Sequence, residues 1–478
     1  MLTVLKPCTR NLHYEKMSDG TVKCIEDEIP FDVPESWAWA RLGFLAFYKK
    51  GPFGSSITKA MFVPDSAEAI KVYEQKNAIC KDETLGTYYI TPEKFLELKG
   101  FEVFPDDIIV SCAGTIGESF VMPSTMRQGV INQALMRIML YDKNIIDFYL
   151  VYFDFVLKSE SNDKGKGTAM KNIPPFDVLK QFLMPIPPLP EQMRILQVIN
   201  QLTACISCID DTKHEITCLM TQAKSKILDL AIRGKLVPQN PADESASVLL
   251  ERIRADKEQL IKAGKIKRDK NESYIFRGDD KSYYEKVGDS VTCIDTDIPY
   301  SVPDNWAWTR LSNLGSIIGG GTPKTSDPTY WDNGTVAWIT PADLSGYTEK
   351  YISRGERNIT EKGLQESSAQ LMPKGSVLFS SRAPIGYITI SANEVCTNQG
   401  FKSVVPYELQ LNEYLYYYLK ARLAEIKTRA SGTTFKEISG TEFGKTLVAL
   451  PPLHEQKVIV SNVETALSRL SVIMENLS

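Results

Sequence analysis

A long internal repeat constrains this chain more than any other feature of its sequence. The segment CIEDEIPFDVPESWAWARL, from Cys24 to Leu42, returns as CIDTDIPYSVPDNWAWTRL from Cys293 to Leu311. Similarity at one fixed offset is typical of a duplicated folding unit. The chain is therefore expected to contain two copies of one module.

Later landmarks recur at slowly shrinking offsets. Ile116-Gly117 matches Ile385-Gly386 at the same offset as the first segment, and three further pairs match at offsets that become slightly smaller along the chain. Between these landmarks the two copies differ greatly, so the framework is repeated while the loop content is not. That pattern is expected when two related modules bind two different targets. The three later matches are Asn132-Gln133 with Asn398-Gln399, Gly167-Thr168 with Gly432-Thr433, and Glu191-Gln192 with Glu455-Gln456.

Each copy ends in a helix with a heptad pattern. The first helix is expected over Glu191 to Arg233, with a length of about 65 Å, after a run of prolines and before Gly234. Its apolar positions alternate spacings of four and three, which is typical of a helix that lays a narrow seam against another helix. The seam residues are Ile195, Ile199, Leu202, Ile206, Ile209, Lys213, Ile216, Met220, Ala223, Ile227 and Leu230.

A second heptad helix follows the same proline-rich opening near the C-terminus. PPLPEQ at 187–192 returns as PPLHEQ at 451–456, and the two helices can therefore pair with each other. The second helix reaches only Ser478, about half the length of the first. The rest of the first helix is then covered either by the segment Tyr14 to Glu28 or by a partner subunit. The second seam consists of Ile459, Val463, Ala466, Leu470, Ile473 and Leu477.

Within each copy the pattern predicts an α/β fold. The P-x-x-W-A-W-x-R-L stretch begins a strand, and Asp107–Ser111 and Ser376–Ser380 are short apolar strands. A second helix is expected between Gly234 and Arg268, because capping residues at 243–245 precede an apolar face. The predicted organisation is a first target-binding domain at 1–190 with an arm at 1–28, a central region with both helices at 191–265, a second domain at 266–454 and a C-terminal helix at 455–478.

Length, cysteine content and net charge limit the class of protein. A chain of 478 residues is too long for one core. The absence of a long apolar run or a leader, and an odd, scattered set of nine cysteines, favour a cytoplasmic protein without a membrane segment. Cys205 and Cys208 fall inside the first heptad helix, so a metal role for them is not favoured. The net charge of −4 leaves room for local basic patches.

Motifs that approach catalytic signatures are incomplete. NIPPF at 172–176 interrupts the tetrapeptide of adenine methyltransferases, and GGGTPKT at 319–325 lacks features of a phosphate loop. Asp65, Glu74 and Lys76 fit the loose pattern of a metal-dependent nuclease, which stays open as an alternative. The chain is otherwise expected to be noncatalytic, with no cofactor and no metal.

Polar and basic residues on glycine turns are the candidates for a DNA interface. Lys, Arg, Ser and Thr suit phosphate contacts, and Arg, Asn and Gln can bond to base edges. The Asn-Gln pairs are more typical of strand caps than of base contacts, and their candidacy for base contacts depends on recurrence at matching positions of the two copies. The candidates in the first copy are Lys49, Lys50, Ser55, Lys59, Thr115, Asn132, Gln133, Lys166, Thr168 and Lys171. Those in the second copy are Lys324, Thr325, Arg382, Asn398, Gln399, Arg429, Thr433 and Lys436.

Taken together, these features resemble the specificity subunit of type I restriction-modification systems. The resemblance covers nearly the whole chain: two modules that open with V-P-x-x-W-x-W and close with P-P-L-x-E-Q, each followed by a heptad helix. RGKLVPQ at 233–239, followed by SVLLERI at 247–253, is similar to the central conserved region of that family.

The resemblance implies a fold and a function. It implies two α/β target-recognition domains separated by an antiparallel coiled coil, each domain reading half of a bipartite, asymmetric DNA site. It also implies a noncatalytic subunit that binds double-stranded DNA, two methyltransferase subunits and restriction-translocase subunits. A nuclease that acts alone, and a scaffold that binds only protein, are the alternatives.

Overall fold

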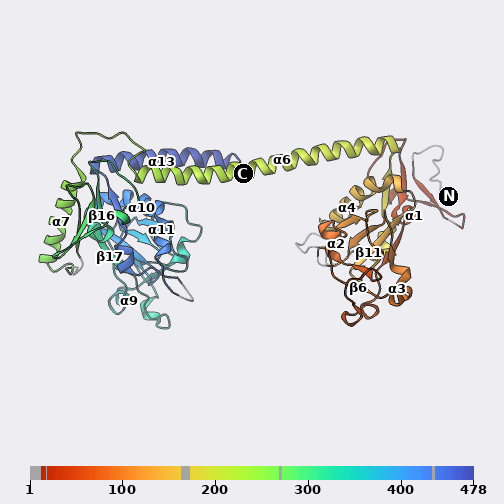
Figure 1. The fold of residues 1–478 in the computed structure, drawn as a ribbon, viewed down its shortest axis with the longest axis horizontal. Coiled ribbons are helices and arrows are strands. Elements are labelled where there is room, and N and C mark those ends of the chain that lie inside the picture. The colour runs from red at the N-terminus through yellow and green to blue at the C-terminus, as the bar shows by residue number, and fades with distance from the viewer. Residues whose placement is uncertain are drawn as a thin grey trace. The chain divides into compact units, whose positions relative to one another are not determined.

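The chain forms two compact units, Met1–Ile209 and Asp210–Ser478. The structure is a computed structural model that describes residues 12–17, 19–113, 115–162, 173–268, 272–432 and 436–477. Each unit contains one copy of the repeat together with part of the long helix α6 (Leu189–Ile232) (Figure 1).

The first unit is built on an antiparallel sheet with the order β4-β11-β8-β9. Helix α4 (Ile146–Asn162) packs Tyr149 and Phe153 against the Val110 and Met136 side of this sheet. The predicted strand at 107–111 is confirmed. The strands are β4 (Ala46–Lys50), β8 (Ile108–Ser111), β9 (Ser119–Val121) and β11 (Leu135–Leu140).

A smaller sheet with the order β6-β5-β10-β7 adjoins the first. Its central strand β10 runs parallel to β5 and antiparallel to β7, and its Val130 packs in a cluster with Phe95 and Leu98 of a short helix. The elements are β5 (Ile70–Tyr73), α2 (Gln75–Cys80), β6 (Tyr89–Ile90), α3 (Pro92–Leu98), β7 (Glu102–Val103) and β10 (Gly129–Ile131).

The strands that enter and leave the first module pair with each other. The entering strand carries Trp39, which lies opposite Pro185 of the leaving strand in an antiparallel ribbon. The predicted strand in the tryptophan-rich stretch is thereby confirmed. The elements here are the hairpin β1 (Tyr14–Lys16) and β2 (Val22–Cys24), β3 (Ala38–Arg41), α1 (Leu42–Leu45), α5 (Phe176–Leu179) and β12 (Leu183–Ile186).

The second unit repeats the main part of this plan. Its sheets have the orders β17-β24-β21-β22-β19, β20-β18-β23 and β16-β25. They match the three arrangements of the first unit with two differences: β19 is added at one edge of the large sheet, and an isolated bridge between Met372 and Val395 stands in the place of β7. The shared topology confirms the duplication and the α/β class. The strands are β16 (Ala307–Arg310), β17 (Gly315–Gly319), β18 (Val336–Ile339), β19 (Tyr351–Ile352), β20 (Arg357–Ile359), β21 (Val377–Phe379), β22 (Ile388–Ser391), β23 (Cys396–Thr397), β24 (Lys402–Pro406) and β25 (Leu447–Leu450).

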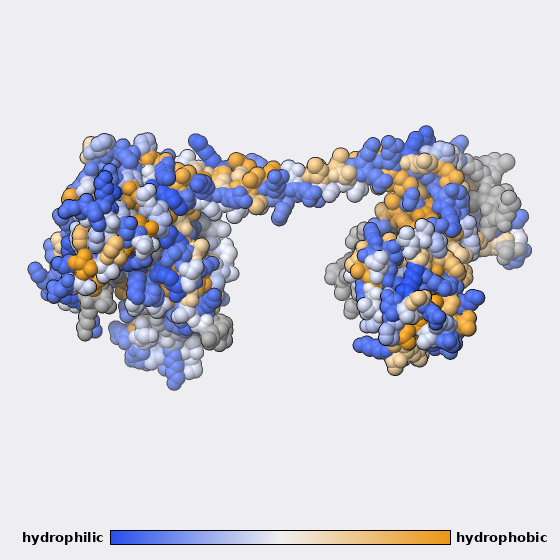
Figure 2. Space-filling model, viewed as in Figure 1, coloured by the Kyte–Doolittle hydropathy of each residue, from blue (hydrophilic) through white to orange (hydrophobic). Residues whose placement is uncertain are grey.

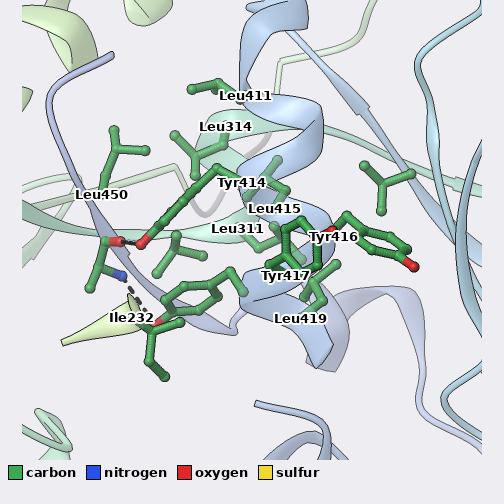
Figure 3. Packing of buried hydrophobic residues seen from close by; sticks show 14 of the residues in the cluster. Ile232, Leu311, Leu314, Leu411, Tyr414, Leu415, Tyr416, Tyr417, Leu419 and Leu450 are labelled. Carbon is green, nitrogen blue, oxygen red and sulfur yellow. Dashed lines mark hydrogen bonds between the residues drawn. The ribbon is translucent and has the colours of Figure 1, made fainter. Parts of the chain in front are cut away.

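Aromatic side chains from one helix fill the core of the second unit. Tyr414 and Leu415 are fully buried between the sheet and the ribbon, and the Tyr414 hydroxyl donates a 2.6 Å hydrogen bond to the Ala449 carbonyl (Figure 3). The helices are α8 (Leu311–Leu314), α9 (Glu361–Gln365), α10 (Asn412–Ala421), α11 (Leu423–Thr428) and α12 (Gly440–Gly444).

The second unit also carries elements between α6 and the repeat. Helix α7 (Ala246–Lys262) buries Leu249 and Ile253, as its predicted apolar face requires, and a three-stranded sheet follows it. Ser245 precedes the helix, but its side chain makes no capping hydrogen bond. The strands are β13 (Ser273–Arg277), β14 (Tyr283–Val287) and β15 (Ser290–Cys293).

The predicted long helix and its end are confirmed. Helix α6 runs for 44 residues, and Gly234 just beyond it has φ +68°, a left-handed conformation that favours glycine. Helix α13 (Leu453–Glu475) is antiparallel to the C-terminal part of α6, since Lys224 Nζ lies 3.5 Å from Met474 Sδ while Ile227 packs in the cluster that contains Ile459 (Figure 1). The predicted coiled coil therefore forms within the second unit.

The middle part of the α6 seam is exposed, whereas Ile195 at its start packs against the core of the first unit. Met220 is buried, whereas Leu202, Ile206 and Ile209 are exposed apolar side chains, and Figure 2 shows apolar residues at the surface along this helix. None of the helices in the described ranges has the length and apolar character needed to cross a bilayer.

The described part of the N-terminal segment does not cover this seam. Glu15 is held by Arg41 of its own module, and Ile25 packs in a cluster with Trp39 and Leu183. The sequence offered two alternatives for covering the unpaired part of α6, and the one in which Tyr14 to Glu28 covers it is therefore wrong.

Candidate nucleic-acid interface

The turn after β10 contains the first Asn-Gln pair, Asn132 and Gln133. Asn132 makes hydrogen bonds within the turn, whereas Gln133 is exposed. The Asn132 side chain accepts a 3.0 Å hydrogen bond from the Ala134 N–H, and the Asn132 N–H donates to the Tyr73 carbonyl at 3.0 Å. The side chain of Gln133 is exposed. Asn132 therefore shapes the turn, and Gln133 is the residue that a ligand can reach.

A glycine allows the neighbouring loop to lie against this turn. A Cβ added to Gly51, which follows β4, would lie 1.8 Å from the Asn132 carbonyl oxygen, so only glycine fits. A Cβ on Gly54 would meet the Gln133 amide oxygen at 2.3 Å. The loop that begins at Gly51 and the Gln133 side chain thus form one surface.

The second module has the same construction. The Asn398 side chain accepts a 2.8 Å hydrogen bond from the Gly400 N–H, and a Cβ on Gly320 would lie 1.9 Å from the Asn398 carbonyl oxygen. Gln399 is exposed, and its amide oxygen accepts a hydrogen bond from the Thr322 hydroxyl. Each module therefore places an accessible glutamine beside a loop that starts with glycine.

In the first module this loop encloses a pocket of about 150 Å³. Phe62 and Tyr88 stack in its wall with ring centroids 4.2 Å apart, and Lys59 and Gln133 also line it. Phe53 stands at the pocket with 89% of its surface exposed. So exposed an aromatic ring is suited to stacking on a base or inserting beside one. Phe53 is not among the residues predicted from the sequence, although the Gly51-Pro52 dipeptide before it is a signal of an exposed turn.

The matching loop of the second module is built differently. The Trp331 indole N–H donates a 3.2 Å hydrogen bond to the Lys324 carbonyl, and the Arg357 guanidinium lies 3.8 Å from the centre of the Trp331 ring. The backbone at Lys324 is thereby anchored, while the side chains of Lys324 and Thr325 remain exposed.

The two candidate arginines of the second module differ in their environments. Arg382 is half-exposed and lies 3.4 Å from Glu437, which Lys402 also approaches at 3.3 Å. Arg429 donates to Glu425, to the Glu442 carbonyl and to the Thr446 hydroxyl. Arg429 therefore ties α11 to the end of α12, which favours a role in the fold, whereas Arg382 keeps part of its surface open.

The remaining candidates divide into accessible, partly engaged and undescribed residues. Lys49 is half-buried, with its ammonium 4.9 Å from the centre of the Phe101 ring. The exposed candidates are Lys50, Ser55, Lys59, Thr115 and Lys436. Lys166, Thr168, Lys171 and Thr433 lie outside the described residues.

The carboxylates of the nuclease alternative are engaged by separate cations. Arg127 donates a 2.6 Å hydrogen bond to Asp65, which lowers the pKa of that carboxyl, and Lys76 lies 3.1 Å from Glu74. In the part of the chain that the structure describes, no three acidic, histidine or cysteine side chains are grouped to hold a metal. Nothing in this geometry supports a nuclease.

The structure defines a protein with two copies of an α/β module, each carrying a glutamine and a glycine-anchored loop, and with an antiparallel helical pair. The sequence matches the profile of the family described as "Type I restriction modification DNA specificity domain" over residues 66–217 and 303–476. The chain belongs to this family.

Individual relatives agree with this assignment. The chain is 41% identical over 184 residues, 38% of its length and 41% of the relative's, to the type I restriction enzyme MjaIX specificity subunit of Methanocaldococcus jannaschii. It is 25% identical over 383 residues, 70% of this chain and 58% of the relative, to the EcoAI specificity subunit of Escherichia coli. The matches thus span about two-fifths to three-fifths of the length of these relatives.

A solved structure shares the fold. A chain from a study of complex assembly and conformational transition of the type I R-M system superposes with a TM-score of 0.54 at 18% identity, over 94% of both chains. At this identity the similarity concerns the fold.

Proposed function

We propose that this chain is a noncatalytic subunit that reads a bipartite, asymmetric DNA site, one half-site with each module. The observation that carries the proposal is the duplicated turn, in which an accessible Gln133 or Gln399 lies beside a loop that differs between the copies. Amide side chains and lysines on such loops suit contacts with base edges and phosphates.

The repeated and the unlike residues have different roles in this proposal. Gln133 and Gln399 occupy the same place in both modules, so they contact features that both half-sites share, such as the sugar-phosphate backbone. Phe53 and Lys59 in the first module, and Lys324 in the second, have no matching residue in the other copy. These residues distinguish one half-site from the other.

The partners follow from the named relatives, which are subunits of type I restriction enzymes. We propose that the chain directs methyltransferase subunits and restriction-translocase subunits to its DNA site, that it needs no cofactor of its own, and that it works in the cytoplasm. The seam of α6 at Leu202, Ile206 and Ile209 is exposed and apolar, which suits packing against a helical partner subunit.

The length of helix α6 bears on the distance between the two proposed half-sites. It continues without a break through residue 209, where the two compact units divide. A continuous helix rises about 1.5 Å per residue, so its length sets how far apart two half-sites can be read.

Exchange of one module tests the function. Residues 40–185 would be replaced with the corresponding module of another family member, and the methylated motif of host DNA would be sequenced with the partner subunits present. One half-site should change while the other half-site stays the same. A change in both halves, or in neither, would contradict the assignment of one module to one half-site.

A further inference from the structure

The second module is covered on one side by residues 233–262, which join α6 to the repeat. In this stretch the loop after α6 leads into α7, and α7 lies beside α8 and β16 (Figure 1). The contacts of this cover show which chemistry the underlying face accepts.

The loop makes the first group of contacts. The Arg233 guanidinium lies 4.7 Å from the centre of the Tyr300 ring, and Gly234 lies so close to Trp306 that an added Cβ would be 3.1 Å from the indole. Gln239 donates a 2.6 Å hydrogen bond to Glu455, whose other oxygen accepts the Trp306 indole N–H at 3.0 Å. The loop thus completes a buried polar network at Trp306.

Helix α7 makes the second group. The Ala246 N–H at its start donates a 2.9 Å hydrogen bond to the Asn305 carbonyl. Leu249 and Ile253 are buried in the core cluster of the second unit, and the Lys257 ammonium lies 5.9 Å from the centre of the Tyr407 ring. The cover is therefore a loop followed by an amphipathic helix, with Arg233 of the loop at one end of the contact and Lys257 of the helix at the other.

The matching face of the first module is open and more aromatic. Phe31, the counterpart of Tyr300, is 44% exposed, whereas Tyr300 is 9% exposed. Phe44, which corresponds to Asn313, is 50% exposed, and Tyr141, which corresponds to Tyr407, is 64% exposed.

The backbone confirms that these tyrosines correspond. The Tyr141 N–H donates to the Leu45 carbonyl, just as the Tyr407 N–H donates to the Leu314 carbonyl, both at 3.0 Å. Each tyrosine therefore leaves its sheet at the same point of the fold, beside α1 in one module and α8 in the other.

Trp37 adds an independent observation. It corresponds to Trp306, but its indole N–H is buried without a hydrogen-bond partner, and Glu191, which corresponds to Glu455, is half-buried rather than buried. An unpaired buried donor destabilises the fold. The network that the loop completes in the second module is incomplete in the first.

We propose that Phe31, Trp37, Phe44 and Tyr141 form a docking face for an amphipathic helix of another polypeptide with the chemistry of residues 233–262. Such a segment carries an arginine over Phe31, a Leu/Ile pair spaced by four residues, and a lysine over Tyr141. A second copy of this chain is not the occupant, because its own 233–262 segment already covers its own second module. This proposal does not depend on the DNA-reading function.

A labelled peptide with the sequence of residues 233–268 is the probe. Fluorescence anisotropy with the full chain should show saturable binding of one peptide. Phe44→Glu or Tyr141→Glu should weaken the binding at least tenfold, because each puts a charge on the docking face. Phe155→Glu, at an exposed aromatic residue of α4 in the same module, is the matched control and should leave the binding unchanged.

Variants of the peptide test the chemistry of the occupant. A peptide with Leu249→Glu and Ile253→Glu should not bind. The proposal is overturned if the intact peptide fails to bind, or if it binds equally well to the Phe44→Glu and Tyr141→Glu chains. It is also overturned if binding requires removal of residues 1–11, since that segment would then be the occupant. A chain dimer that Phe44→Glu dissociates would point to a second copy instead.

Discussion

Arg41 contacts both carboxylate oxygens of Glu15, with hydrogen bonds of 2.7–3.0 Å from Nε and Nη2, in the interior of the first module. Arg310 and Glu285 repeat this pairing in the second module at 2.6–3.0 Å. In each copy the remaining guanidinium nitrogen, Nη1, donates to a backbone carbonyl just before the leaving strand, at Gln181 in the first module and at Lys445 in the second. The pair therefore joins the hairpin before the module to both of its ends.

Removal of the first arginine should destabilise the first module. Arg41→Ala should lower its free energy of unfolding by about 3–5 kcal/mol, because Glu15 would be left buried and uncompensated. Urea unfolding monitored by tryptophan fluorescence measures the change. Lys23→Ala is the control, since the Lys23–Glu28 pair is exposed and such pairs contribute about 1 kcal/mol or less. A loss below about 1 kcal/mol for Arg41→Ala would show that the pair is not structural.

The second pair predicts a pH dependence. Hydrogen bonding from Arg310 lowers the pKa of Glu285 in the folded chain. A carboxyl with a lowered folded pKa contributes stability that is present above its unfolded pKa, about 4.3, and is lost as the pH falls through the folded value. The urea midpoint of the second unit should fall more steeply below about pH 4.3 in the unaltered chain than in Glu285→Gln. Glu251→Gln, an exposed residue of α7, should keep the steep profile. Parallel profiles for the unaltered chain and Glu285→Gln would refute this link.

Substitutions of Asn398 and Gln399, which are neighbours in the turn, should affect stability and DNA binding separately. Asn398→Ala removes the acceptor of the Gly400 N–H and should destabilise the second unit by about 1 kcal/mol. Gln399→Ala removes an exposed side chain, so it should leave the urea midpoint unchanged and weaken DNA binding across all sequences. Gel-shift titrations with the partner subunits measure the binding. A weakening confined to sequences changed in the second half-site would mean that Gln399 reads a base.

The α6 seam offers a matched pair of substitutions. Met220→Asp places a charge at a buried position of the seam and should destabilise the second unit by several kcal/mol, because an unpaired charge is buried. Ile206→Asp changes an exposed seam residue and should leave the melting temperature of the isolated chain within a few degrees of the original. Equal effects of the two substitutions would mean that the seam is covered along both parts of the helix.

Lengthening α6 should change the gap between half-sites. Insertion of seven residues near Thr212 keeps the heptad phase and adds about 10 Å of helix, or about three base pairs. Sequencing of the methylated motif should then show a longer gap and two unchanged half-sites. Altered half-sites would show that the helix contributes to base reading.

Features with a local signature could be predicted from the sequence. The heptad spacing predicted α6 to within two residues at its start and one at its end, because an apolar seam and a terminal glycine are both local patterns. The repeated tryptophan stretch likewise predicted β3 and β16.

Pairings between distant residues could not be predicted in the same way. Glu15 and Arg41 lie 26 residues apart in the sequence, and nothing in either neighbourhood marks them as partners. The role of Asn132 in the turn depends on the Ala134 N–H pointing at its side chain, which only the backbone conformation decides. Arg429 was a reasonable DNA candidate by type and position, yet the close approach of α12 gives its guanidinium three partners within the fold.

The ribbon of β3 and β12 has a consequence for how a whole module can be exchanged between genes. Because Trp39 and Pro185 face each other across one ladder, the two ends of the module are neighbours in space although nearly the whole module separates them in the gene. A recombination event with breakpoints in these two strands would deliver a foreign insert whose ends already meet. The same holds for β16 and β25. Each module can therefore be exchanged as one piece at its two-stranded ribbon, and the long helices need no change.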